Sequence, residues 1–441
     1  MSEIIFTRTA FPIAPGGQIY EWSEVETKFE IPADGIFAVK ITAAAKNAEQ
    51  NNSTDDDDLR VNLDGFDFGK YEIHDEKVSW KGFGTAASFD GASLKGGTKT
   101  VYFFANLTAG EHKLEFTVDG KPELKKIEVL QLDQTFGLRD LQPTEKTETD
   151  KKGVPWLSFV FLGLPAKTLT LGVKTKSAKA KGGTDGDNLK VVVNGKILPN
   201  KKAPTSDKYK NFYFSGDLNE FDVLSLGEQE LNSSLAFENS IELWYDESPK
   251  ISDLKLQFFD WEEFFESVNS EGVLEICRSF ANFVHTVFIS TRQKYSADFL
   301  KHSLKDKPEN LIFQTDDPIM KKIKSDPTYE KIIGKFKEKI SSEILDGEVL
   351  PSDFDGGINF DSPDLNTAIH GVKKIEYKAI EKSSGNFEVD FTIFDVYNFE
   401  MQKHSLFTPK KRAIDAIAKC QELNIISNFE IRIILKENIR I

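Results

Sequence analysis

Over the first 260 residues, apolar and polar side chains alternate with a period of two. Residues 114–118 (LEFTV) and residues 241–245 (IELWY) both show this alternation. It is typical of a β-strand with one face on a core. Residues 64–65 (DG) and 194–195 (NG) supply the turn chemistry of tight hairpins. Short strands separated by such polar turns predict antiparallel sheets rather than helices.

The pattern occurs twice along the chain. Residues 114–129 align without a gap with residues 241–256, and residues 54–65 align with residues 184–195. The two offsets, 127 and 130 residues, nearly agree, which indicates duplication of a whole domain rather than of a short motif. Each copy is long enough to bury its own core. The sequence therefore predicts two tandem antiparallel β-sandwiches.

After Trp261 the hydrophobic period changes to three and four residues, which is typical of helices. Helices are predicted at residues 273–288, 296–304, 319–324, 327–341 and 410–423. Strands return at residues 372–380, 387–394 and 430–435. The last third is therefore predicted to be a separate α+β domain.

The predicted fold class is multidomain, with two tandem antiparallel β-sandwiches followed by an α+β domain. The first module is expected to cover residues 1–136, and the second residues 137–260, beginning with a polar linker. The third domain is expected at residues 261–441, helical over 261–345 and mixed over 346–441.

Composition limits the kinds of partner that the chain can bind. Of the 441 residues, 39% are apolar, which suffices for globular cores and argues against disorder. The net charge of −15 disfavours binding to nucleic acid or to anionic membranes. The chain shows no signal peptide and no apolar run of about 18 residues, so we expect it not to be transmembrane. The oligomeric state stays open.

The chain has only two cysteines, Cys277 and Cys420. Two cysteines are too few for a disulfide framework, and both lie in stretches with a helical pattern. They are therefore predicted to be buried, inert thiols.

An acidic loop precedes a predicted strand in each copy, with Asp55 and Asp57 in the first and Asp185 and Asp187 in the second. Clustered carboxylates in a loop can bind Ca²⁺, which prefers six to eight oxygen ligands. The favoured interpretation is a solvated turn, because Asp also favours turn geometry and the spacing is not that of an EF-hand. Calcium is the one cofactor that the sequence suggests.

Two tryptophans are candidate ligand-binding residues. Trp244 occupies a polar position of its strand, aligned with Thr117, so its ring is predicted to point away from the core of its own module. An exposed indole can stack on a sugar ring. Trp80 is the second candidate. For both, packing within the protein is the competing interpretation.

Family resemblance adds a cellular context. Residues 156–174, 185–195 and 241–256 resemble uncharacterised β-modules of large surface or secreted proteins from candidate-phyla bacteria. Residues 98–129 are similar to the partner module of those proteins and, more generally, to carbohydrate-binding-module sandwiches. The resemblance implies an extracellular or cell-surface location, whereas the sequence shows no signal peptide and leaves a cytoplasmic location open. It also implies that the partner is a glycan or another surface protein.

The C-terminal part carries a different resemblance. Residues 364–377 and 385–400 are similar to a C-terminal domain of bacterial polymorphic toxins. The ending around Asp395 resembles the colicin M group, which cleaves a lipid-linked peptidoglycan precursor. This implies Asp395 as an essential acid, with His370 and His404 as acid/base partners. The second acid of that motif is Asn398 here, which removes a general base or metal ligand.

Two functions follow. The favoured hypothesis is a non-enzymatic binding or display protein of the bacterial surface or secreted fraction, whose duplicated modules recognise glycans. The alternative is a toxin or cell-wall hydrolase delivered by the β-modules. Under the favoured hypothesis, Asp395, His370 and His404 do not form a cleft, and Phe391 and Ile393 pack inward.

Overall fold

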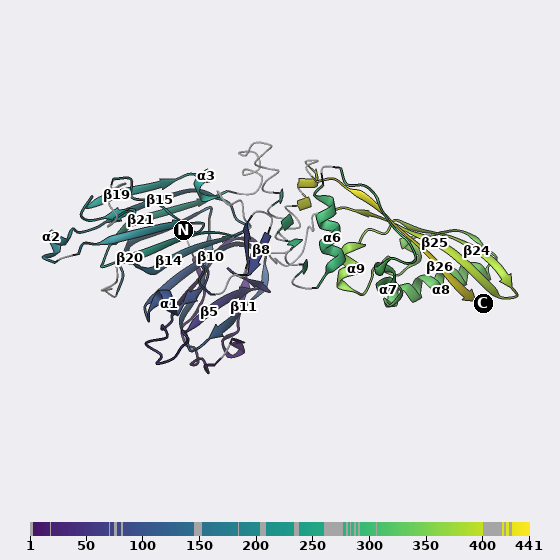
Figure 1. Cartoon of the computed structure of the whole chain (residues 1–441), viewed down its shortest axis with the longest axis horizontal. Coiled ribbons are helices and arrows are strands. Elements are labelled where there is room, and N and C mark those ends of the chain that lie inside the picture. The colour runs from purple at the N-terminus through teal and green to yellow at the C-terminus, as the bar shows by residue number, and fades with distance from the viewer. Residues whose placement is uncertain are drawn as a thin grey trace. The chain divides into compact units, whose positions relative to one another are not determined.

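The computed structural model describes most of the chain. The described residues are 3–17, 19–69, 83–144, 152–183, 185–202, 209–232, 238–259, 292–305, 307–399 and 426–441, the backbone of 71–74 and 77–80, and parts of 277–289 and 417–422. They divide into two compact units, one ending at Phe259 and the other beginning at Cys277 (Figure 1). Among the helices of these residues, not one combines the length and the apolar content needed to span a bilayer.

The first half of the first unit contains two sheets. One has the order β1-β12-β4-β10, formed by β1 (Glu3–Arg8), β12 (Glu123–Leu132), β4 (Gly35–Ala44) and β10 (Thr98–Leu107). The other is centred on β11 (Gly110–Asp119) and β5 (Asp58–Leu63), with β2 (Tyr20–Glu21), β3 (Thr27–Ile31), β6 (Phe66–Asp67) and β9 (Phe89–Asp90) beside them. Between the sheets, the rings of Phe68 and Phe103 lie 4.3 Å apart.

The second half repeats this strand order. The sheet β13-β21-β15-β19 is formed by β13 (Thr135–Leu141), β21 (Lys250–Phe258), β15 (Ala166–Lys174) and β19 (Phe221–Leu226). Facing it are β14 (Val154–Leu162), β20 (Glu238–Asp246), β16 (Asn188–Val193), β17 (Lys196–Ile197) and β18 (Phe214–Ser215). Short elements complete the unit: η1 (Ser23–Val25), β7 (Tyr71–His74), β8 (Lys77–Trp80), α1 (Gly91–Leu94), α2 (Ala178–Lys181) and α3 (Glu228–Leu231).

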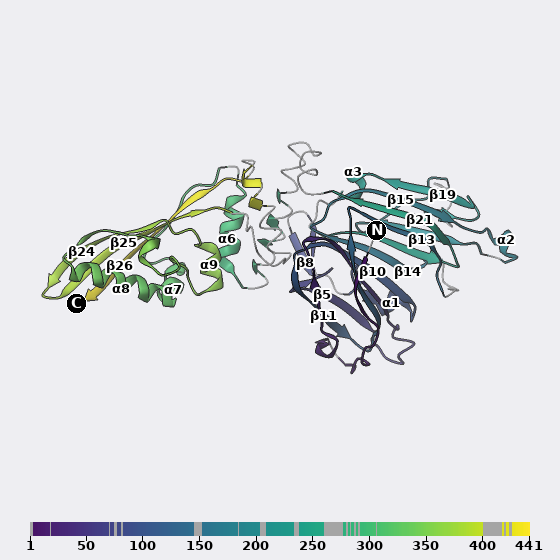
Figure 2. The same cartoon turned by 180° about the vertical axis from the view of Figure 1, so that it is seen from behind.

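The two halves share one sheet. Strand β10 of the first half pairs in parallel with β14 of the second, from Thr100–Leu157 to Ala105–Leu162 (Figure 2). This joint creates a nine-stranded sheet in the order β1-β12-β4-β10-β14-β20-β16-β17, with β18 beside β16. The boundary predicted between residues 136 and 137 falls inside β13.

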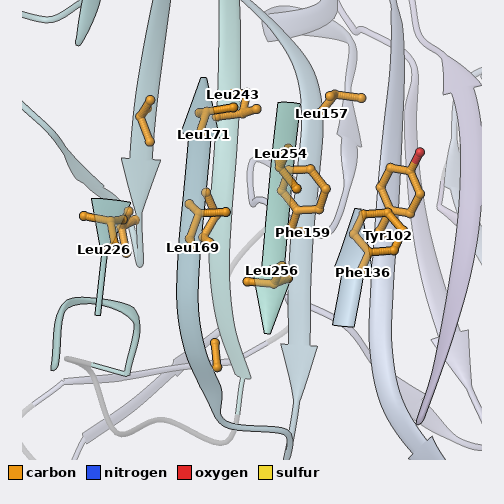
Figure 3. Close-up of a cluster of buried hydrophobic side chains, with 14 of the residues drawn as sticks. Tyr102, Phe136, Leu157, Phe159, Leu169, Leu171, Leu226, Leu243, Leu254 and Leu256 are labelled. Carbon is orange, nitrogen blue, oxygen red and sulfur yellow. The ribbon is translucent and has the colours of Figure 1, made fainter. Parts of the chain in front are cut away.

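The core of the second half includes side chains from both halves. Tyr102 and Phe104 of β10 belong to the same buried cluster as Phe159 and Phe161 of β14. The ring of Tyr102 lies 5.5 Å from that of Phe159 and 5.0 Å from that of Phe136 (Figure 3). The cluster also contains leucines of the four-stranded sheet, namely Leu169, Leu171, Leu254 and Leu256. Burial of these apolar side chains is the main force that holds the halves together.

The second unit contains one five-stranded sheet with helices. Its order is β22 (Leu311–Phe313), β26 (Phe429–Arg440), β25 (Asn386–Tyr397), β24 (Lys374–Ser383) and β23 (Asp346–Val349). The helical elements are α6 (Lys294–Ser303), α7 (Pro318–Lys324), α8 (Pro327–Ser341), η2 (Pro351–Asp353) and α9 (Pro363–Ala368). Phe336 of α8 packs on Tyr377 and Phe391 of the sheet, at ring distances of 5.0 and 4.9 Å. The helices predicted at 273–288 and 410–423 lie mostly outside the described residues.

The two cysteines of the second unit form a disulfide. Cys277 and Cys420 are both fully buried, and their Cα atoms lie 6.0 Å apart across 143 residues of sequence. The prediction of two inert thiols was therefore wrong. It relied on the local helical pattern of each cysteine, and such a pattern carries no information about which distant segment packs against it.

Candidate functional site

Asp57, one of the predicted calcium ligands, accepts hydrogen bonds from backbone N–H groups. Its side chain is only 3% exposed. Oδ1 accepts hydrogen bonds from the backbone N–H of Lys121 (2.7 Å) and from Asn51 Nδ2 (2.9 Å), and Oδ2 accepts from the N–H of Lys46 (3.2 Å). Asp57 therefore ties its own loop to the end of β4 and to the turn after β11.

Asp187 makes the same connection in the second copy. Its Oδ2 accepts from the backbone N–H of Lys176 (2.8 Å) and its Oδ1 from that of Ser248 (3.2 Å). Lys176 and Ser248 are the counterparts of Lys46 and Lys121 at the offsets of 130 and 127 residues. Lys181 Nζ adds an ion pair at 3.0 Å. The repeated acid therefore has a role in the fold, because it holds the same two backbone segments in both copies.

The two other predicted calcium ligands are more accessible. Asp55 is exposed, and the carboxylate of Asp185 accepts a hydrogen bond from the adjacent N–H of Gly186 (3.0 Å). The calcium assignment itself stays a prediction.

A different set of acids gathers in the first copy. Carboxylate oxygens of Asp56, Asp58 and Asp90 lie within 4.8 Å of one another. Burial, together with the charges of Asp56 and Asp90, raises the pKa of Asp58 to about 7. Burial also raises the pKa of Asp56. Oxygen atoms this close are the kind of ligands that a divalent cation uses.

The sequence showed only part of this cluster. Asp56 and Asp58 belong to the visible run of acids, but Asp90 joins them through the pairing of β5 with β9, where Asp58 lies opposite it. The second copy has Gly186, Asn188 and Ser215 at the three corresponding positions. Because the second copy keeps the strand order without these acids, the fold does not require their charges.

Replacing Asp58 with asparagine is expected to change how stability depends on pH. A carboxyl group whose pKa is raised on folding stabilises the protein below its unfolded pKa of 3.8, and this stability is lost as pH rises to about 7. Asp58→Asn should therefore reduce the loss of unfolding free energy between pH 4 and pH 7 by about 1–2 kcal/mol, allowing for partial exposure. Urea denaturation at several pH values measures this.

The matched control is Asp55→Asn, which changes an exposed acid of the same loop and should leave the pH profile unchanged. Equal profiles for wild type and Asp58→Asn would contradict the prediction. The same proteins test whether a divalent cation binds the cluster of Asp56, Asp58 and Asp90, because a cation that binds only the folded state raises the melting temperature at pH 7.5 once its concentration exceeds the dissociation constant. Asp58→Asn should abolish that rise.

Trp244 lies on the outer face of β20 and is half-buried, between the buried Leu243 and Tyr245. The Nζ atom of Lys190 lies 3.9 Å from the centroid of its ring, and its Nε1 donates to Glu242 Oε2 at 3.3 Å. One face of the indole is thus covered by a cation. The side chain of Trp80 lies outside the described residues.

The structure brings Asp395 and His370 together in the second unit. Asp395 lies near the end of β25 and is 2% exposed; its Oδ1 accepts a hydrogen bond from the N–H of Val396 (2.8 Å). Burial raises the pKa of Asp395, and nearby His370 opposes this effect. His370 Nε2 lies 2.7 Å from the carbonyl oxygen of Asn398, and Nδ1 lies 3.1 Å from that of Thr367. His404 lies outside the described residues.

This geometry favours a structural role for the pair. Both ring nitrogens of His370 face backbone carbonyl oxygens, so neither is directed at a substrate, and the carboxylate of Asp395 is buried. Together they connect the segment after α9 to the end of β25. Phe391 and Ile393 pack inward, as predicted. The predicted absence of a cleft stays a prediction, because it includes His404.

The fold defines the chain as a multidomain, β-rich protein. No family model and no curated protein matches it. Among solved structures, the chain is similar to dimeric latent PorU from Porphyromonas gingivalis (12% identity, TM-score 0.19), over 57% of this chain and 21% of that one. It is also similar to a triple jelly-roll protein of an archaeal virus (12%, TM-score 0.16; 53% and 55% covered). A third similarity is to Sulfolobus Turreted Icosahedral Virus (11%, TM-score 0.15; 53% and 56% covered).

The chain thus spans about a fifth of the PorU chain and just over half of the two viral chains. At these TM-scores the similarities carry no argument about function.

Proposed function

We propose that this chain is a non-enzymatic binding or display protein of the bacterial cell surface or secreted fraction. Its first unit is a pair of antiparallel β-sandwiches that share one sheet, and its partner is a glycan or another surface protein. The observation that carries the proposal is what the two copies have in common. They share the strand order and the aspartate that ties the loops together, whereas the acidic cluster occurs in one copy only.

The repeated features therefore belong to the scaffold. If a catalytic domain had been duplicated, both copies would be expected to contain the same catalytic residues. These copies instead share an aspartate, Asp57 or Asp187, that accepts hydrogen bonds from the backbone of two other loops. The shared sheet joins them into one body that holds loops from both copies in fixed positions. Rigid β-scaffolds that position loops are a common basis for recognition.

The toxin or hydrolase alternative is less well supported. It needs Asp395 and His370 to reach a substrate. However, Asp395 is buried, and both ring nitrogens of His370 face backbone carbonyl oxygens. Periplasmic expression of the full chain in a bacterial host tests it directly. We expect normal growth; growth inhibition that Asp395→Ala abolishes would establish the alternative.

The disulfide supports an exported location. Disulfides persist in oxidising compartments and are rare in the reducing cytosol. We expect the protein, exported and purified without reductant and then denatured, to bind no thiol-alkylating reagent, and to bind two equivalents after reduction. Mass spectrometry measures this. Cys277→Ser is the control and should expose one thiol without reductant. Two free thiols in the exported wild type would contradict the expectation.

Glycan binding is tested with the full chain on a glycan array. If the indole of Trp244 stacks on a sugar, Trp244→Ala should weaken binding of the best ligand by about tenfold. Trp156→Phe, a change at another half-buried tryptophan, should retain binding. Absence of any array signal would remove the carbohydrate part of the proposal and leave a surface protein as the partner.

A further inference from the structure

His112 of β11 lies in the interior of the first copy, between hydrogen-bond acceptors from two different loops. Its side chain is only 1% exposed. Nδ1 lies 2.6 Å from Asp64 Oδ2, in the turn after β5, and Nε2 lies 2.8 Å from the carbonyl oxygen of Thr108, in the connection between β10 and β11. A neutral imidazole carries one N–H, whereas an imidazolium carries two. Only the protonated ring can therefore donate to both acceptors.

The surroundings of the ring also favour its charged form. Phe29 of β3 stacks on it at 5.8 Å, and the carboxylate of Glu30, the next residue of β3, adds a negative charge. Burial by itself lowers the pKa of His112. The hydrogen bonds to Asp64 and Thr108 and the two carboxylate charges outweigh burial and raise this pKa above its usual 6.5. The protonated ring thus stabilises the fold fully below pH 6.5, and this stability is lost as pH rises through the raised pKa.

Loss of the proton acts on the connection between β10 and β11. The remaining N–H stays with the carboxylate of Asp64, which is the stronger acceptor. The bare Nε2 then faces the carbonyl oxygen of Thr108, and two buried acceptors without a proton between them must separate or admit water. Asp64 remains tied to β11, because its Oδ1 accepts from the N–H of Lys113 at 2.9 Å. The segment at Thr108 is therefore the one that is released.

The second copy makes the same connection with neutral groups. Asn194 is the counterpart of Asp64, and both have a left-handed backbone, with φ values of 49° and 51°. Its Oδ1 accepts from the N–H of Ser240 (2.8 Å), and its Nδ2 donates directly to the carbonyl oxygen of Leu231 (3.1 Å), ahead of β20. Asn239 takes the place of the histidine. The fold can thus make this connection without an ionisable ring.

We propose that His112 is a pH-sensitive latch of the first copy. The protonated ring holds the connection between β10 and β11 against the turn after β5, and the neutral ring releases it. The amide groups of the second copy do not titrate in this pH range, so its corresponding connection stays closed. The latch is independent of the proposed binding function, because it sets when a loop is held and not what is bound.

Hydrogen exchange of the full chain, followed by mass spectrometry at pH 5.5 and pH 8.5 and corrected for the intrinsic exchange rate at each pH, measures the release. We expect peptides that cover residues 105–110 to lose protection by about fivefold or more at pH 8.5. Peptides that cover residues 228–232 of the second copy should change less than about twofold.

Two variants separate the latch from other pH effects. The double variant with Asp64→Asn and His112→Asn carries the asparagines of the second copy and should abolish the difference between the two pH values. The matched control is Asp58→Asn, which removes another acid of raised pKa from β5 and should retain the difference.

The proton itself is followed by NMR of the full chain with ¹³C-labelled histidine. The resonance of His112 is the one that the double variant lacks, and it should titrate above pH 6.5. A ring that is already neutral at pH 5.5 would overturn the proposal. So would equal protection of residues 105–110 at both pH values in the wild type, which is read without any variant, or a release that persists in the double variant.

Discussion

Replacing Phe104 with alanine is expected to lower the free energy of unfolding of the first unit by about 3–5 kcal/mol. The ring is fully buried. It lies 5.1 Å from the ring of Phe136, 5.5 Å from that of Phe161 and 5.1 Å from that of Phe258. Phe104 belongs to the first copy by sequence, but its neighbours belong to the core of the second. The substitution therefore leaves a cavity at the joint between them.

Urea denaturation followed by tryptophan fluorescence and by circular dichroism measures the effect. The control is Asn106→Ala, which changes a half-buried residue of the same strand and should cost less than about 1 kcal/mol. Because the two halves share a sheet and a core, the unfolding transition of the first unit should move to lower urea concentration by the same amount in fluorescence and in circular dichroism. A separate transition of either half, unaffected by Phe104→Ala, would contradict the shared core.

Replacing Asp57 with alanine is expected to cost about 3 kcal/mol or more of unfolding free energy. The substitution removes the acceptor of two backbone N–H groups and of Asn51, and unsatisfied buried donors cost about 1–3 kcal/mol each. Asp187→Ala should have a similar effect, since it removes the same acceptor in the second copy. Thermal and urea denaturation of the full chain measure both.

Asp55→Ala is the control that separates the two interpretations of this loop. A calcium loop would use Asp55 and Asp57 alike, so both substitutions would matter only while the ion is bound. If Asp57 acts through its hydrogen bonds to the backbone, Asp57→Ala should destabilise the protein equally with and without a chelator, whereas Asp55→Ala should have little effect. Similar losses of unfolding free energy for both variants that disappear when calcium is chelated would contradict this role.

The joint between the copies left a signal in the sequence. Residues 101–105 (VYFFA) of β10 and residues 157–162 (LSFVFL) of β14 are almost uniformly apolar, unlike the alternating residues 114–118 of β11. A strand that is apolar on both sides is buried on both faces. These apolar segments therefore indicated that both strands are buried on both faces, but they did not indicate that β10 and β14 pair with each other.

The sequence by itself determined the local elements. The alternating segments 114–118 and 241–245 lie in β11 and β20, and the predicted inward residues Phe391 and Ile393 are buried in β25. These predictions succeed because strand periodicity depends on neighbouring residues alone.

Only the tertiary structure decided which distant segments meet. It paired β10 with β14, placed Asp90 beside Asp58, joined Cys277 to Cys420, and directed Arg8 to the carbonyl groups that precede β3. Each of these contacts joins residues that are far apart in the chain, and neither partner carries a local pattern that specifies the other. Such pairings are selected by the burial of apolar surface and the satisfaction of backbone hydrogen bonds over the whole unit.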